Sequence, residues 1–99
     1  MNKFTVIISP RAKKDIKTFY NHICYEYKQP ETAAKNRRYL QNRINQLSWC
    51  AGVVGSNEYV QGMFGTNARH IIFKKMAIIF YFEDDYVYVD RVIASALIH

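Results

Sequence analysis

Hydrophobic and polar residues follow two different periods along this chain, and the periods predict strands near both ends with helices between them. The first segment, Phe4–Ile8, is β-branched or aromatic, and it ends at Ser9-Pro10, a hydroxyl suited to an N-cap before a proline suited to a first helical turn. A strand is therefore expected to lead directly into a helix at Ser9. The apolar residues that follow recur at helical spacing and predict a strongly amphipathic helix: Ala12, Ile16, Phe19, Tyr20, Ile23 and Tyr27.

A second helix is predicted to begin at Pro30, which cannot continue the first helix but can open another. Glu31 suits the positive end of its dipole, and a second apolar stripe indicates that it runs as far as Ala51-Gly52. Trp49, near its end, is interpreted as a lid over the core. Because the connection between the two helices is so short, they are expected to pack as an antiparallel hairpin.

The last part of the chain is rich in β-forming residues. Residues 53–68 are glycine-rich and weakly patterned, which predicts a loop with at most one short strand. Three dense β segments follow, Arg69–Phe73, Met76–Phe82 and Tyr86–Ile93, and the acidic residues 83–85 form a hairpin turn between the last two. The chain is therefore predicted to be an α+β, two-layer fold: an N-terminal strand, the antiparallel helical hairpin, then a three-stranded antiparallel meander, all strands forming one antiparallel sheet.

Composition and charge limit the domain count, the partners and the location of the chain. The 99 residues are 49% hydrophobic and 22% charged, as expected for a single domain spanning residues 1–99. The net charge of +6 favours an anionic partner, either nucleic acid or an acidic protein. Cys24 and Cys50 fall at opposite ends of the predicted hairpin, so two reduced thiols and a cytoplasmic location are expected. No apolar run is long enough to span a membrane, and no membrane partner is expected.

Neither a metal nor a cofactor is predicted. The three histidines, His22, His70 and His99, and the two cysteines do not have the spacing of metal ligands. No glycine-rich loop precedes a helix in the way that a phosphate-binding turn requires.

The whole pattern resembles the RelE/ParE toxin superfamily, and more closely its ParE-like branch. The resemblance rests on seven parts of the chain: 9–16, Tyr20, 30–34, 40–47, Arg69, 78–81 and 87–93. It implies the toxin of a bacterial type II toxin–antitoxin system, of the kind associated with plasmid stabilization. A cognate antitoxin is implied as partner, with a tail that covers the exposed sheet face. Dimerisation through that face is the alternative, and a homodimer and a toxin–antitoxin heterotetramer both remain open.

The resemblance implies one of two activities. ParE-like members bind DNA gyrase and poison it without chemistry of their own, whereas RelE-like members cut mRNA on the ribosome. For a nuclease, Arg69, Tyr81 and Arg91 are the catalytic candidates, because RNA cleavage needs proton transfer and cations beside the phosphorane. The chain has only Ala94–His99 where RelE-like nucleases carry further basic, histidine or tyrosine side chains. A gyrase inhibitor is therefore the first prediction, and a ribosome-dependent mRNA endonuclease is the alternative.

The residues expected to contact the target or the antitoxin are mostly cationic: Lys35, Arg38, Arg69, His70, Lys74, Lys75 and Arg91. The plain alternative for those on the second helix is a solvated surface. A second alternative function is a non-toxic RNA-binding or adaptor domain that stacks bases on Tyr86 and Tyr88. All of these functions require a sheet face that the hairpin leaves open. This face is expected to be both apolar and cationic.

Overall fold

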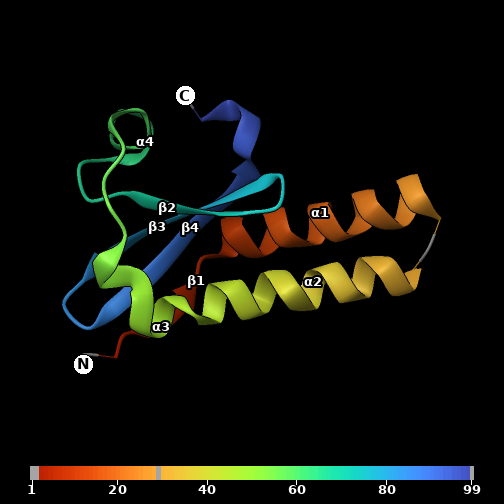
Figure 1. Ribbon diagram of the computed structural model, residues 1–99, viewed down its shortest axis with the longest axis horizontal. Helices are drawn as coiled ribbons and strands as arrows, with labels where there is room; N and C mark the ends of the chain where they lie inside the picture. The colour runs from red at the N-terminus through yellow and green to blue at the C-terminus, as the bar shows by residue number, and fades with distance from the viewer. Residues whose placement is uncertain (1–2, 29, 99) are drawn as a thin grey trace.

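The helical hairpin forms one layer of the fold. In the computed structural model, which describes residues 3–28 and 30–98, β1 (Thr5–Ile8) leads into α1 (Pro10–Tyr27), and α2 (Pro30–Asn45) returns beside it. Figure 1 shows the two helices side by side, with their connected ends projecting beyond the sheet. Both predicted helices and the hairpin are confirmed.

Ser9 fixes the start of α1, as predicted. Its Oγ accepts a hydrogen bond from the Ala12 N–H at 3.0 Å, which caps the helix, and donates to the Asp90 carbonyl at 2.9 Å. Pro10 follows in the first turn, where its missing N–H costs nothing. One side chain therefore caps α1 and ties it to the strand that contains Asp90.

The sheet has four strands in the order β1-β4-β3-β2, with β2 (Arg69–Phe73), β3 (Met76–Glu83) and β4 (Tyr86–Ala94) forming the predicted antiparallel meander. β1 lies at the edge beside β4 and runs parallel to it, so the sheet is mixed, and the expectation of an entirely antiparallel sheet was wrong. No tight turn joins this pair, because the helices, β2 and β3 all lie between β1 and β4 in the chain.

The main core lies between the hairpin and one face of the sheet. Phe80 and Ile78 of β3 are fully buried there, against Leu40 and Ile44 of α2 and Ala12 of α1. Alternation along the strands sends Val87 and Val89 of β4 to the same face. This packing accounts for the apolar stripes read from both helices.

A short helix replaces part of the loop predicted over residues 53–68. α4 (Glu58–Phe64) starts at Asn57, whose side chain accepts a hydrogen bond from the Val60 N–H at 3.0 Å, and Glu58 lies in its first turn. Its apolar contribution is a single pair at i, i+4, Val60 and Phe64, with Gly62 between them. Two apolar residues are too few to show a helical period in the sequence. The expectation of a loop was therefore wrong.

α4 and the C-terminal segment build a small second core on the other face of the sheet. Val60 of α4 packs there with Ala77 and Ile79 of β3, while Ile93 and Ile98 lie against them. Figure 1 places α4 and the C-terminal 3₁₀ helix η2 (Ser95–Leu97) on the side of the sheet opposite the hairpin. The second face is therefore covered at one end and open at the other.

The second helix ends earlier than predicted. α2 stops at Asn45, a turn at Gln46 follows, and α3 (Leu47–Cys50) continues into the 3₁₀ helix η1 (Ala51–Val53). Leu47 and Ala51 are fully buried in the main core, whereas the Trp49 side chain is 61% exposed. The interpretation of Trp49 as a core lid was wrong, because Leu47 and Ala51 occupy the positions that face the sheet.

Candidate functional site

The open end of the second sheet face carries a cluster of exposed aromatic side chains. Tyr81 of β3 stacks on Tyr88 of β4 with ring centroids 5.3 Å apart, and Tyr86 lies 6.1 Å from Tyr88 in a tilted arrangement. Ile7 of β1 is in register with Tyr88, and Thr5 with Tyr86, so these side chains share the face. We call this surface the tyrosine face: Thr5, Ile7, Tyr81, Tyr86 and Tyr88.

The tyrosine face has the chemistry of a protein-binding surface. Tyr86 is 44% exposed, Ile7 38% and Tyr81 36%, so three large side chains from three strands lie together at the surface. Tyrosine is favoured in interfaces because its ring buries a large apolar area while its hydroxyl stays hydrogen-bonded. The face was expected to be cationic as well, but none of its five residues is charged. The tyrosine face itself therefore supplies no cation.

Arg69 lies on the hairpin side of the sheet. It is opposite Phe80 in the β2–β3 register, and its guanidinium carbon is 5.8 Å from the centroid of the Phe82 ring. Its Nη1 also donates to the Ala68 carbonyl at 3.1 Å. Arg69 is therefore half-buried and directed away from Tyr81, which lies on the opposite face.

His70 points to the other side of β2, in register with Ile79. Its Nδ1 is buried without a hydrogen-bond partner among the described residues. Burial lowers the pKa of His70 because it disfavours the imidazolium. The ring is therefore neutral at physiological pH and does not supply a cation for binding an anionic target.

Arg91 is held in an ion pair with Asp15 of α1. Its Nε donates to Oδ2 at 2.7 Å and its Nη2 to Oδ1 at 3.2 Å, while the Val92 N–H donates to the same Oδ2 at 3.0 Å. The hydrogen bond to Asp15 raises the pKa of Arg91 further. The carboxylate thus joins α1 to β4 and neutralises this arginine.

Lys35, one of the two predicted basic residues of α2, lies near one of the lysines of the β2–β3 turn. Lys35 and Lys74 place their Nζ atoms 5.8 and 5.9 Å from the centroid of the Tyr39 ring, and the Lys74 Nζ also donates a hydrogen bond to the Asn36 Oδ1. Lys75 is next along the turn and exposed, and Arg38 is exposed on α2. Two groups that are 39 residues apart in sequence, Lys35 and Lys74, therefore form one basic surface around Tyr39.

Comparison with known proteins identifies the fold. No family model matches the sequence, and no curated protein matches it significantly. Among solved structures, a chain described as "Chromosomal ParDE TA system from P. aeruginosa" superposes with a TM-score of 0.78. The match covers 93% of this chain and 96% of that one, at 14% sequence identity. The chain has the ParE-like fold. The resemblance read from the sequence is thereby confirmed at the level of the fold.

Within this ParE-like fold the three candidate nuclease residues do not converge. Arg69 lies over Phe82 on the hairpin side, Tyr81 stacks on Tyr88 on the opposite face, and Arg91 is paired with Asp15. General acid–base catalysis requires its groups within hydrogen-bonding reach of one substrate. The geometry therefore gives no support to a catalytic set built from these three residues.

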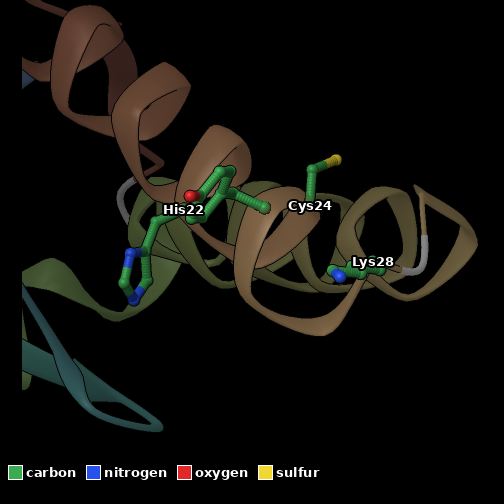
Figure 2. Close-up of a pocket in the computed structure, with 4 residues that line it drawn as sticks. His22, Cys24 and Lys28 are labelled. Carbon is green, nitrogen blue, oxygen red and sulfur yellow. The ribbon is translucent and has the colours of Figure 1, made fainter.

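Among the described residues, two of the surface depressions were candidates for a site, and neither brings reactive side chains together. The larger, about 870 Å³, lies at the outer end of α1 beside His22, Cys24, Tyr25 and Lys28. Figure 2 shows His22, Cys24 and Lys28 pointing in different directions from the helix. The smaller, about 360 Å³, lies between α1 and the end of β4, and the Arg91–Asp15 pair forms part of its wall.

Neither a cluster of potential metal ligands nor a membrane-spanning helix occurs among the residues that the structure describes. Within residues 3–28 and 30–98, no three His, Cys, Asp or Glu side chains gather closely enough to hold a metal ion. Over the same residues, no helix combines the length and apolarity needed to cross a bilayer.

Asp15 and Ile7 were missed as site residues. The sequence does indicate that Asp15 is unusual, because it is the lone acidic residue in the basic stretch 11–17 and lies one residue before the core position Ile16. Ile7 carried no such signal, because its exposure depends on the edge that β1 occupies. The alternation of Tyr86 and Tyr88 with Val87 and Val89 was visible in the sequence, but it did not identify which face would stay open.

Proposed function

We propose that this chain is the toxin of a type II toxin–antitoxin system, neutralised by a cognate antitoxin and inhibiting growth by binding DNA gyrase. The observation that carries the proposal is the superposition, over 93% of the chain, on a chain of a ParDE TA system. The sequence resemblance points to the same branch, in which the toxin acts on gyrase. Residues 1–99 act as one toxin domain in the cytoplasm.

The tyrosine face supports an antitoxin as partner. The hairpin covers one side of the sheet and α4 covers one end of the other, which leaves Tyr81, Tyr86 and Ile7 exposed. Contiguous exposed aromatic surface of this kind marks protein–protein contacts. An antitoxin segment lying across β1, β4 and β3 would bury these side chains.

A non-catalytic mechanism fits the arrangement of polar groups better than RNA cleavage. Arg91 is neutralised by Asp15, and Arg69 and Tyr81 project to opposite sides of the sheet. A gyrase inhibitor needs a binding surface and no acid–base pair. The proposal therefore requires no residue to have a perturbed protonation state.

Inducible expression of the chain without its antitoxin tests this function. We expect growth arrest with induction of the DNA-damage response, because a poisoned gyrase leaves broken DNA. Co-expression of the protein encoded by the neighbouring reading frame should restore growth. Arrest with immediate loss of translation and cleaved transcripts would support the mRNA endonuclease instead, and normal growth would contradict both activities.

A further inference from the structure

The tyrosine face is bordered by acidic residues, although the chain as a whole is basic. Glu83, the last residue of β3, is in register with Tyr86 and lies two positions after Tyr81, so its side chain projects on the tyrosine face. Asp84 and Asp85 follow it in the turn into β4, and all three carboxylate side chains are exposed. We call Glu83, Asp84 and Asp85 the acidic rim.

Most cations of the chain are too distant from the acidic rim to neutralise it, or are already paired. The hairpin cations belong to the layer on the other face of the sheet (Figure 1). Of the five cations outside residues 10–45, four lie away from the rim: Arg69, Lys74, Lys75 and Arg91. Arg91 is paired with Asp15, and Arg69 lies on the hairpin side of the sheet.

The two lysines of the β2–β3 turn lie at the opposite end of β3 from Glu83, about 23 Å away at ~3.3 Å per residue. The Debye length at physiological salt is only about 8 Å, so these lysines are screened from the rim. The fifth cation, Lys3, is exposed just before β1 and offsets at most one of the three carboxylates. The open end of the sheet face is therefore acidic.

The aromatic rings of the tyrosine face are available to cations from another molecule. Elsewhere in the chain, lysine and arginine lie over aromatic rings, as the Lys35 Nζ does at 5.8 Å from the centroid of the Tyr39 ring. Among residues 3–28 and 30–98, no such contact is made to Tyr81, Tyr86 or Tyr88, whose ring contacts are with one another. An exposed tyrosine ring attracts a lysine or arginine through its π-electrons.

We propose that the partner segment that docks on the tyrosine face is basic, with lysine or arginine side chains over the tyrosine rings and their charged groups at the acidic rim. The proposal rests on the proposed function, in which this segment belongs to the antitoxin, and it names the chemistry of the segment. The rings and the carboxylates select the same occupant, because a cation is attracted by both. An acidic segment, which the net charge of +6 would suggest, would instead place like charges together at the rim.

The dimensions of the tyrosine face fit a short extended segment. Adjacent strands lie about 4.8 Å apart, so the face extends about 10 Å from β3 across β4 to β1. A hexapeptide at ~3.3 Å per residue is long enough to cross it, with alternate side chains directed at the sheet. Ile7 on β1 offers an apolar contact to the aliphatic stems of such side chains.

Fluorescence anisotropy of two labelled hexapeptides, one of three leucine–arginine repeats and one of three leucine–glutamate repeats, tests the proposal with the purified chain. The arginine peptide should bind more tightly than the glutamate peptide, despite the net charge of +6 on the chain. An exposed ion pair typically contributes a factor of about 1.5–5 in affinity, so Glu83→Gln/Asp84→Asn should bind the arginine peptide about fivefold more weakly at low salt. Asparagine is tolerated at position 84, where Asp84 has a φ of 53°.

The matched control is Glu31→Gln/Glu58→Gln, which changes the net charge by the same amount at exposed first-turn positions of α2 and α4. It should leave the affinity for the arginine peptide unchanged within about twofold, because neither carboxylate borders the tyrosine face. Circular dichroism of both variants confirms that each is folded. The protein encoded by the neighbouring reading frame should displace the arginine peptide from the unmodified chain.

The proposal would be overturned by an arginine peptide that does not bind, by tighter binding of the glutamate peptide, or by equal weakening in the rim variant and the control. An antitoxin that binds the chain without displacing the arginine peptide would also overturn it, since the two would then occupy different surfaces. Growth arrest and its reversal by the antitoxin test the proposed function without either peptide, so its failure is distinguishable from failure here.

Discussion

The Phe80→Ala variant is expected to lose about 3–5 kcal/mol of unfolding free energy, the usual cost of deleting a buried aromatic ring. Phe80 is fully buried between the sheet and the hairpin, beside Leu40 and Ile44 and in tilted contact with Phe82. A domain of this size has a total stability of only about 5–15 kcal/mol, so the loss is a large fraction of it. Urea denaturation followed by circular dichroism measures the difference.

The adjacent residue provides the matched control. Tyr81 lies on the opposite face at 36% exposure, and its main described contact is the stacking on Tyr88. Tyr81→Ala should therefore cost only about 1 kcal/mol, the usual worth of an aromatic pair. Similar losses for the two variants would mean that the two faces of β3 are not differently covered.

The Tyr81→Ser/Tyr86→Ser variant is expected to bind the cognate antitoxin at least about 100-fold more weakly. A tyrosine in the centre of a protein interface typically contributes about 2 kcal/mol or more, and about 1.4 kcal/mol corresponds to a factor of ten in affinity. Both rings are exposed in the free chain, so their removal takes little from the core packing. Isothermal titration calorimetry with the protein encoded by the neighbouring reading frame measures the affinity.

Tyr25→Ser is the control for that variant. Tyr25 is 86% exposed near the outer end of α1, on a different element from the tyrosine face. Its replacement should leave antitoxin affinity unchanged within about twofold. If Tyr25→Ser weakened binding and the double variant did not, the antitoxin would bind along the hairpin and not across the open sheet.

Local chemistry allowed much of the fold to be predicted. Ser9-Pro10 and Pro30-Glu31 specify helix starts in the sequence itself, and the acidic turn at 83–85 separates two runs of β-forming residues. Elements whose signals lie outside their own residues were harder to place. The parallel pairing of β1 with β4 depends on a crossover by the entire hairpin, and α4 offers only Val60 and Phe64 as an apolar stripe.

The candidate site was less predictable than the fold, because it depends on which side of a strand each residue faces. Arg69 and His70 are neighbours in sequence but project to opposite faces of β2. Arg91 was predicted to contact a partner, but the packing of α1 against β4 places Asp15 beside it in an ion pair. Residue type alone marked these side chains as cationic or titratable, whereas long-range contacts determine which of them are free to bind.

A gyrase supercoiling assay with the purified chain tests the central claim most directly. We expect near-stoichiometric amounts of the chain to block supercoiling of relaxed plasmid and to trap cleaved DNA, and addition of the antitoxin to restore activity. Unimpaired supercoiling at a large molar excess of folded chain, under conditions in which its expression still arrests growth, would contradict the account.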